Sequence, residues 1–417
     1  MSSLPQARRH PMNFSRLASL SLTLLLAASR LHAAELPMRD VIANDVRIAS
    51  EQYRYLLAQA HDTPGFPRSF EHGQRQMVDV KDWTAGFFPG SLWYLAEATG
   101  APQWRSAAIA YTAKMEAAKD ERSTHDLGFM LYTSYGNGLR LTGDPAYRKV
   151  LLTAADTLSL RFNPVVGSIQ SWNVPHHTVA GQRSDWTFPV IIDNMMNLEL
   201  LTWASRASGQ PRYRDIAIAH ADTALRHHFR ADGSSYHVVD YDPATGRVHE
   251  RVTAQGYADG SAWARGQAWG LYGYTMMYRE TQRPEYLAQA QKIAAFIMHH
   301  PRLPADKIPY WDYDDAAIPN APRDASAAAV SSSALLELRH FVDAGLARQY
   351  TDFAEQQLRS LSSPEYLARP GENGGFLLKH STGHKPAGRE IDVPLNYADY
   401  YFLEALLRDR APAAAGH

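Results

Sequence analysis

A short motif recurs four times in the chain and constrains the fold more than any other feature. Each copy has Pro two residues after its first position and an aromatic residue two positions after the Pro; the copies begin at Gly100, Gly143, Gly209 and Gln282. Gly often ends a helix, and Pro favours the first turn of the next one. Each copy therefore predicts the turn of a helical hairpin, and repeats with this spacing are typical of stacked or toroidal helical arrays.

Apolar residues recur at helical spacing almost throughout the chain from Leu36 onward. Helices are predicted near residues 40–61, 84–99, 102–119, 126–141, 145–162, 186–208, 211–229, 261–281, 284–300, 325–344, 348–362 and 391–408. Connections within each pair are short, whereas those after every second helix, such as 163–185 and 230–260, are long. This pattern predicts an all-α fold, an (α/α)6 barrel of six helical hairpins, with its functional residues at the long-loop end. Only Ser235 to Tyr241 suggests strand, as a short hairpin arm.

The first 34 residues form a segment distinct from the rest. Three arginines precede the apolar run LASLSLTLLLAA, and small residues follow it. This order is typical of a secretory signal peptide, and the run is too short to span a bilayer. We therefore expect cleavage after Ala33 or Ala34, an exported protein that is periplasmic or secreted and not held in a membrane, and a single catalytic domain over residues 35–417.

Composition excludes several classes of site and partner. The chain has 417 residues, no cysteine, 42 basic residues and 43 acidic ones. Without cysteine there is no disulfide, no thiolate metal site and no cysteine nucleophile. The absence of a basic block argues against binding to nucleic acid or to long polyanions. No HExxH, Walker or GxSxG motif occurs, and the sequence predicts no metal.

An acidic residue interrupts one of the most apolar predicted helices. Asp193 lies within PVIIDNMMNLELL, beside Asn194 and among aliphatic side chains. A carboxylate there loses hydration, which favours its protonated form. A carboxyl group that is protonated near neutral pH can act as a general acid. The alternative is a structural acid that caps a loop or pairs with an arginine.

A second acid opens another helix at the predicted long-loop end. His125 and Asp126 begin the segment HDLGF. An Asp at this position often only caps the helix. Two carboxylates that face one cavity would instead favour protonation of one and leave the other ionised. Asp126 is therefore a candidate partner for a second carboxyl group such as Asp193.

Aromatic, amide and guanidinium groups gather in the segment TAQGYADGSAWARGQAWGLYGY. Arg265 and Trp269 are four residues apart and share a helix face, and Gln255 lies in the preceding loop. A planar cation beside an indole and an amide suits a sugar carboxylate. The alternative is aromatic packing, with Arg265 paired to a structural acid. Trp83 and Trp172 also fall at loop ends, where a single Trp more often belongs to the core.

Several motifs, in this order, resemble the unsaturated glucuronyl hydrolases of glycoside hydrolase family 88. They are WTAGFFPGSLW from Trp83, HDLGF from His125, IIDNMMNL, HVVD from His237, the segment rich in aromatic residues, and STGHKPAGREIDVPLNYADYYFLEAL from Ser381. The resemblance covers nearly all of the chain after the signal segment. It implies an (α/α)6 barrel, no required cofactor, and a small unsaturated oligosaccharide as substrate. The 4,5-unsaturated uronic acid at its non-reducing end would be removed by hydration of the vinyl ether.

The resemblance also implies roles for individual residues. Asp193 matches the catalytic acid and base, and Asp126 matches its partner carboxylate. The residues expected around the substrate are His125, His237, Gln255, Arg265 and Trp269, with Trp83 and Trp172 lining the site and Ser381 in the last long loop contacting the neighbouring sugar.

Three other functions compete with this interpretation. An unsaturated rhamnogalacturonyl hydrolase would share the barrel and the hydration chemistry but act on products of pectin lyases. A secreted sugar-binding protein would keep the aromatic cleft without the chemistry, and the presence of both Asp126 and Asp193 argues against it. An inverting glucosidase on the same barrel finds no support in the HDLGF and ARGQAW motifs.

Overall fold

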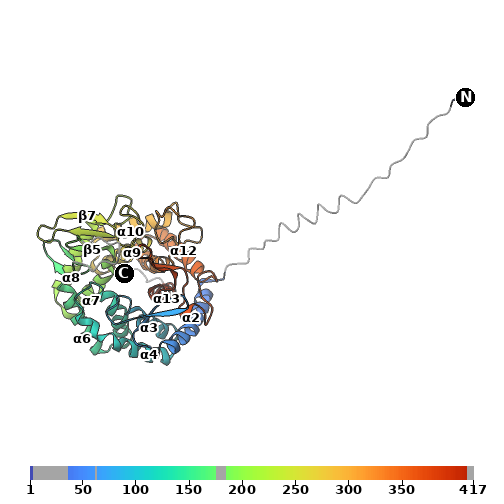
Figure 1. The fold of residues 1–417 in the computed structure, drawn as a ribbon. Helices are drawn as coiled ribbons and strands as arrows, with labels where there is room; N and C mark the ends of the chain where they lie inside the picture. The colour runs from blue at the N-terminus through green and yellow to red at the C-terminus, as the bar shows by residue number, and fades with distance from the viewer. Residues whose placement is uncertain (3–35, 62, 175–184, 411–417) are drawn as a thin grey trace.

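The computed structural model describes residues 1–2, 36–61, 63–174 and 185–410. In this part of the chain, twelve α-helices, α2 to α13, are arranged as two concentric rings (Figure 1). This confirms the predicted (α/α)6 barrel. The expected signal peptide lies outside the described residues. None of the helices in the described ranges combines the length and apolar character that crossing a membrane requires.

Helices alternate along the chain between the outer and the inner ring. The outer helices are α2 (Met38–Ala60), α4 (Pro102–Lys114), α6 (Pro145–Ser159), α8 (Pro211–His227), α10 (Pro284–His299) and α12 (Ala344–Leu361). The inner elements are α3 (Phe87–Thr99), the π-helix η2 (Gly128–Gly136) with α5 (Asn137–Thr142), the 3₁₀-helix η3 (Ile192–Asn197) with α7 (Leu198–Ser208), α9 (Ala264–Thr281), α11 (Ala325–Leu338) and α13 (Asn396–Arg410). Each inner element contacts the next, and α13 contacts α3, so the inner ring is closed.

The two rings differ in how their side chains are distributed. Every residue of α11, ASAAAVSSSALLEL, is buried, as expected for a helix with protein on all sides. In the outer helix α12 the buried side chains fall on one face, at Tyr350, Phe353, Ala354, Gln357, Leu358 and Leu361. A helix without a polar face must be surrounded by protein on all sides. Such helices therefore lie in the inner ring.

The repeated motif forms the turns between inner and outer helices. Gly100, Gly143 and Gly209 have φ angles of 68°, 69° and 73°, and Gln282 has a φ of 57°. Each donates its backbone N–H to the carbonyl four residues earlier and so caps the inner helix. The prolines two residues later start the outer helices α4, α6, α8 and α10. The predicted hairpin turns are confirmed.

Short strands gather in the long connections that lead from outer to inner helices. Antiparallel pairs are formed by β1 (Phe66–Glu71) with β2 (Gln74–Val78), β3 (Phe162–Asn163) with β4 (Ser168–Ile169), and β8 (Ser381–His384) with β9 (Arg389–Val393). A three-stranded sheet has the order β5 (Pro189–Ile191), β6 (Val238–Tyr241) and β7 (Val248–Val252). We had expected only one such arm, which corresponds to β6.

The predicted helix 186–208 is wrong over its first part. Residues Pro189–Ile191 form strand β5, in which Ile191 pairs with Val238 of β6. The helix proper starts at Leu198, after the 3₁₀-helix η3. Val190 and Ile191 are β-branched and suit a buried strand as well as a helix, so the presence of a partner strand decides between the two.

An aromatic layer closes the middle of the barrel. Phe87, Phe129, Trp269 and Tyr401 come from four inner elements and are at most 2% exposed. The Phe129 ring lies 5.5 Å from that of Phe87 and 5.1 Å from that of Trp269. The Tyr401 ring lies 5.3 Å from that of Trp269 and 5.9 Å from that of Phe87. These tilted and edge contacts fill the barrel axis and separate the long-loop half from the short-turn half.

We expect Gly209→Ala to lower the free energy of unfolding by about 1 kcal/mol, because an L-residue resists the left-handed conformation that ends α7. A Cβ there would meet no other atom within 4 Å, so conformation alone determines the effect. Gly260→Ala is the matched control, since Gly260 has open space around it and no positive φ. Denaturant unfolding of both variants provides the measurement. Equal stability of the two would contradict the prediction.

Candidate active site

A cavity of about 310 Å³ opens at the long-loop end of the barrel. It contains four of the residues predicted from the sequence, Trp83, Trp172, His237 and Gln255. The other lining residues are Arg68, Asp82, Ala254, Gly383, His384, Arg389, Glu390 and Tyr397. They come from connections far apart in the sequence, because all the outer-to-inner loops meet at this end of the barrel.

Asp193 lies at the start of η3; it is not itself among the residues that line the cavity, but it lies next to His237, which is. The strand β5 sets its position: the N–H of Ile192 donates to the carbonyl of His237 at 3.0 Å, which continues the pairing of β5 with β6. Asp193 is 7% exposed, and its Oδ2 has no hydrogen-bond partner among the described residues. The nearest polar atom recorded for that oxygen is Nε2 of His237, at 3.5 Å.

The backbone determines which nitrogen of His237 carries the proton. Its Nδ1 accepts hydrogen bonds from the N–H groups of Ala254, at 3.0 Å, and Gln255, at 3.1 Å. A nitrogen that accepts two such bonds is deprotonated, so the ring proton is on Nε2. Nε2–H therefore faces Oδ2 of Asp193.

Asp126 lies just before η2, and its side chain is 16% exposed. Burial raises the pKa of Asp126 to about 7; the Thr124 hydroxyl, which donates to this carboxylate, opposes the rise, and the charge of Asp193 adds to it. Nε2 of His125 lies 3.2 Å from Asp126, and burial lowers the pKa of His125 to about 3, so this imidazole is neutral. Burial therefore opposes the ionised state expected for Asp126.

Glycines allow the elements that carry the two acids to pack closely. A Cβ on Gly128 would lie 2.5 Å from Cα of Asn197, so η2 and η3 touch through their backbones. A Cβ on Gly273 of α9 would lie 2.4 Å from Cβ of Met195 on the other side of η3. The N–H of Phe129 donates to the Asn197 side chain at 3.0 Å across the first contact. These close approaches fix η3 between its neighbours.

The structure corrects the role expected for Arg265. This side chain is fully buried and does not line the cavity. One of its amino groups donates to Asp324 at 3.0 Å and to the carbonyl of Thr382 at 2.5 Å, and the other donates to the carbonyl of Gly383 at 2.6 Å. Burial raises the pKa of Asp324, and Arg265 opposes that rise. Arg265 therefore holds the last long loop against α9 and α11, and its amino groups are already engaged.

Three further residues predicted to contact substrate lie away from the cavity. Trp269 belongs to the aromatic layer and is 0% exposed. Ser381 is fully buried where β8 pairs with β9, and His125 is buried behind Asp126. The loop of Ser381 does reach the cavity, but through Gly383 and His384. For Trp269 the physical cause is that helical periodicity places a residue on a face of the helix, but not above or below the layer that closes the barrel.

Sequence reasoning missed an ion-pair cluster in the cavity wall. Arg68 of β1 lies 2.7 Å from Asp82 and binds Glu390 of β9 through two nitrogens. Tyr397 packs on Trp83, with ring centroids 5.0 Å apart. Asp82, Glu390 and Tyr397 fall within or next to the quoted motifs, but Arg68 lies outside them, and only folding brings the four together.

Comparison with known proteins identifies the family. The family model for Glycosyl Hydrolase Family 88 matches residues 63–404. The chain belongs to this family.

Relatives agree with this assignment along most of their length. The family 88 chain is 49% identical over 346 residues to the unsaturated glucuronyl hydrolase of Formosa agariphila. The matched region covers 82% of this chain and 84% of the relative. A solved unsaturated glucuronyl hydrolase specific for heparin superposes with a TM-score of 0.84 at 50% identity, covering 89% of this chain and 97% of that one. A UGL structure with dGlcA-Glc-Rha-Glc has a TM-score of 0.80 at 32% identity, with coverage of 87% and 95%.

We expect Asp126→Asn to stabilise this family 88 protein, and more so at higher pH. The folded-state pKa of Asp126, about 7, lies above the ordinary 3.8, so wild-type stability falls as pH rises between these values. The variant has no such loss, and its advantage should grow across this window to at most about 4 kcal/mol. Denaturant unfolding of both proteins at several pH values tests this. Other buried acids are common to both proteins and cancel in the difference, so a flat difference curve would contradict the assignment.

We expect Arg265→Lys to lower the free energy of unfolding by about 2 kcal/mol, because a single ammonium cannot replace charge-assisted hydrogen bonds to three acceptors. Arg214→Lys is the matched control, since Arg214 is exposed on the outer helix α8 and does not line the cavity. Thermal melting combined with substrate kinetics measures both effects. An Arg265→Lys variant that melted like the wild type but bound substrate more weakly would assign Arg265 to direct substrate contact.

Proposed function

We propose that this family 88 protein removes the 4,5-unsaturated uronic acid from the non-reducing end of oligosaccharides made by polysaccharide lyases. One observation carries the proposal: two carboxyl groups, Asp126 and Asp193, are held close together beside a cavity lined by Trp83 and Trp172. The relatives named as unsaturated glucuronyl hydrolases support it. The signal-like first 34 residues support export, so we also propose that the enzyme meets its substrate outside the cytoplasm.

The reaction follows from the chemistry of a vinyl ether. A carboxyl group delivers a proton to carbon 4, and the positive charge that develops at carbon 5 is shared with the ring oxygen. Water adds to carbon 5 and gives up a proton to the carboxylate. The resulting hemiketal opens to a keto acid, and the hemiacetal left at carbon 1 releases the remaining sugar. The separation of carboxylates used to assign inverting or retaining hydrolysis does not apply, because neither acid attacks the anomeric carbon.

The acid pair is suited to both halves of this reaction. With its pKa near 7, Asp126 allows the pair to hold a proton near neutral pH. We assign the proton transfers to Asp193, whose Oδ2 has no hydrogen-bond partner among the described residues. Once Asp193 has given up its proton, Nε2–H of His237, 3.5 Å away, stabilises the carboxylate that must then activate water.

The cavity wall offers polar groups for the sugars. The side chain of Gln255 donates to the carbonyl of Gly383 at 3.3 Å, and Nε2 of His384 lies 3.0 Å from the carbonyl of Ala254. These bonds tie the loop before α9 to β8. We propose that Gly383, His384 and the exposed Arg389 contact the sugar next to the unsaturated ring, with Lys385 turned instead toward Asp315 at 3.2 Å.

We expect Asp193→Asn to lower kcat by about two to four powers of ten, because the amide cannot deliver the proton. Asp215→Asn, on the exposed face of α8, is the matched control and should keep wild-type activity. The measurement is loss of the ultraviolet absorbance of the carbon 4–carbon 5 double bond, with melting curves alongside. An Asp193→Asn protein with wild-type kcat would contradict the mechanism.

The same assay separates the proposed activity from its rivals. Unsaturated disaccharides prepared from chondroitin, hyaluronan, heparin, xanthan, ulvan and pectin form the substrate panel. Consumption of uronate disaccharides other than the pectin product supports the proposal. Consumption of the pectin product alone would indicate a rhamnogalacturonyl hydrolase, and binding without loss of absorbance would indicate a sugar-binding protein.

A further inference from the structure

A second cavity, of about 560 Å³, occupies the short-turn half of the barrel. Its lining includes Glu97, Arg140, Arg279 and Arg408, which lie toward the C-terminal ends of inner helices, whereas Asp126 and Asp193 lie at the N-terminal ends of inner elements. Phe129 and Tyr401 of the aromatic layer form part of its wall. The two cavities therefore lie on opposite sides of that layer. This volume falls in the range of pockets that hold small ligands, about 300–1,000 Å³.

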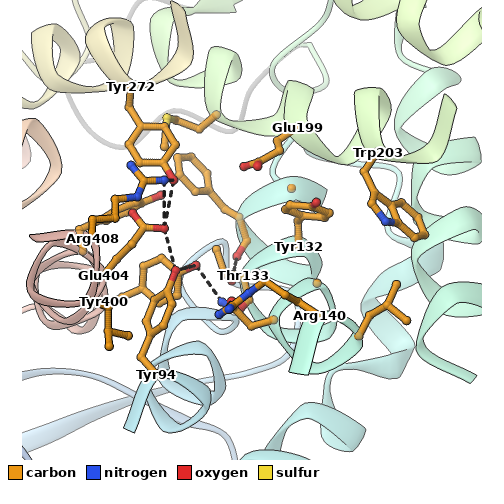
Figure 2. Close-up of a pocket in the computed structure, with 18 of the residues that line it drawn as sticks. Tyr94, Tyr132, Thr133, Arg140, Glu199, Trp203, Tyr272, Tyr400, Glu404 and Arg408 are labelled. Atoms are coloured by element: carbon orange, nitrogen blue, oxygen red, sulfur yellow. Dashed lines mark hydrogen bonds and ion pairs between the residues drawn. The ribbon is translucent and has the colours of Figure 1, made fainter. Parts of the chain in front are cut away.

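One side of this short-turn cavity is lined by aromatic rings and the other by polar side chains. Figure 2 shows the rings of Tyr132 and Trp203 on one side and Tyr272, Glu404 and Tyr94 on the other. On the polar side the hydroxyl of Tyr94 donates to Glu404 at 2.7 Å, and that of Tyr272 donates to the same oxygen at 3.1 Å. On the aromatic side the rings of Tyr132 and Trp203 are only half-buried. A ligand in this cavity would meet ring faces on one side and hydroxyl and carboxylate groups on the other.

Charges in the wall are balanced and paired. The lining contains three arginines and three glutamates, which are Arg140, Arg279, Arg408, Glu97, Glu199 and Glu404. Arg140 binds both oxygens of Glu97, at 2.7 and 2.6 Å. Arg279 pairs with Glu199, and Arg408 lies 3.6 Å from Glu404. Arg279 and Arg408 are also paired with Glu337, at 2.6 and 2.8 Å. An ionic ligand would therefore find each charge in the wall already compensated, whereas a neutral one disturbs none of these pairs.

We propose that the short-turn cavity binds a neutral saccharide, a mono- or disaccharide of pyranose sugars. A pyranose presents C–H groups on its ring faces, which stack on aromatic rings, and hydroxyls at its edge, which both donate and accept. Paired Arg and Glu side chains keep spare donors and lone pairs for such hydroxyls. The mouth is accessible, since the side chains of Arg140 and Glu97 are 48% and 31% exposed. This site needs no chemistry at Asp126 or Asp193, and it makes the protein bivalent for sugars.

Ligand-observed NMR titration of the full-length protein tests the proposal, with glucose, galactose and N-acetylglucosamine as neutral probes and glucuronate as the charged probe of matched size. We expect at least one neutral sugar to bind with a millimolar Kd, and more tightly than glucuronate. Trp203→Ala should weaken that binding about tenfold, whereas Trp203→Phe, which keeps a ring, should retain it. Trp172→Ala, in the other cavity, should not change it.

Activity measured in parallel separates this proposal from the catalytic one. Trp203→Ala should hydrolyse unsaturated disaccharides like the wild type, and Asp193→Asn should bind the neutral sugar like the wild type. The proposal is overturned if none of the three neutral sugars binds up to about 100 mM. It is also overturned if the Trp203→Ala curve matches that of the wild type, or if glucuronate is the tighter ligand of the site that depends on Trp203.

Discussion

Backbone contact between neighbouring inner elements is the constraint on which the site depends. The Gly128–Asn197 and Gly273–Met195 contacts leave no room for a side chain, so η3 is clamped between η2 and α9. The acids Asp126 and Asp193 stand at or just before the starts of two of these elements, so their proximity follows from the packing of the inner ring. Flexible loops would not hold two carboxyl groups together at the desolvation cost that the pKa of Asp126 reveals.

The repeated turn and the helical periodicity were enough to predict the barrel, because each acts locally. A Gly in the left-handed conformation followed by Pro ends one helix and starts another whatever surrounds it. The strand β5 could not be predicted in this way, because its conformation depends on β6, nearly fifty residues later in the chain. Secondary structure could be predicted from the sequence where it depends on interactions between residues close together in the chain. The prediction failed where a distant segment supplies the hydrogen bonds.

The predictions for the candidate site succeeded and failed for a similar reason. Trp83, Trp172, His237 and Gln255 belong to the long loops and line the cavity, as their positions in the sequence suggested. Arg265 and Trp269 share a face of α9, but one is bonded to loop carbonyls and the other fills the aromatic layer. Chemical type alone could not separate these two roles, since a guanidinium suits a backbone carbonyl as well as a sugar carboxylate. The depth of a residue along the barrel axis makes the difference, and only the closed ring defines that depth.

A raised carboxyl pKa does not by itself mark a functional acid in this fold. Burial also raises the pKa of Asp45 and of Asp399 to about 7. Yet Asp399 accepts from two backbone N–H groups and from the hydroxyl of Tyr53, and Asp45 accepts from a serine hydroxyl. Asp399 has both carboxylate oxygens hydrogen-bonded inside the protein, whereas Oδ1 of Asp45 has no hydrogen-bond partner among the described residues. Asp126 differs because the charge of a second acid, Asp193, adds to the rise in its pKa. Oδ2 of Asp193 has no hydrogen-bond partner within the described chain. An unsatisfied carboxyl oxygen costs stability, and its persistence beside a second acid supports the proton transfer that we propose for Asp193.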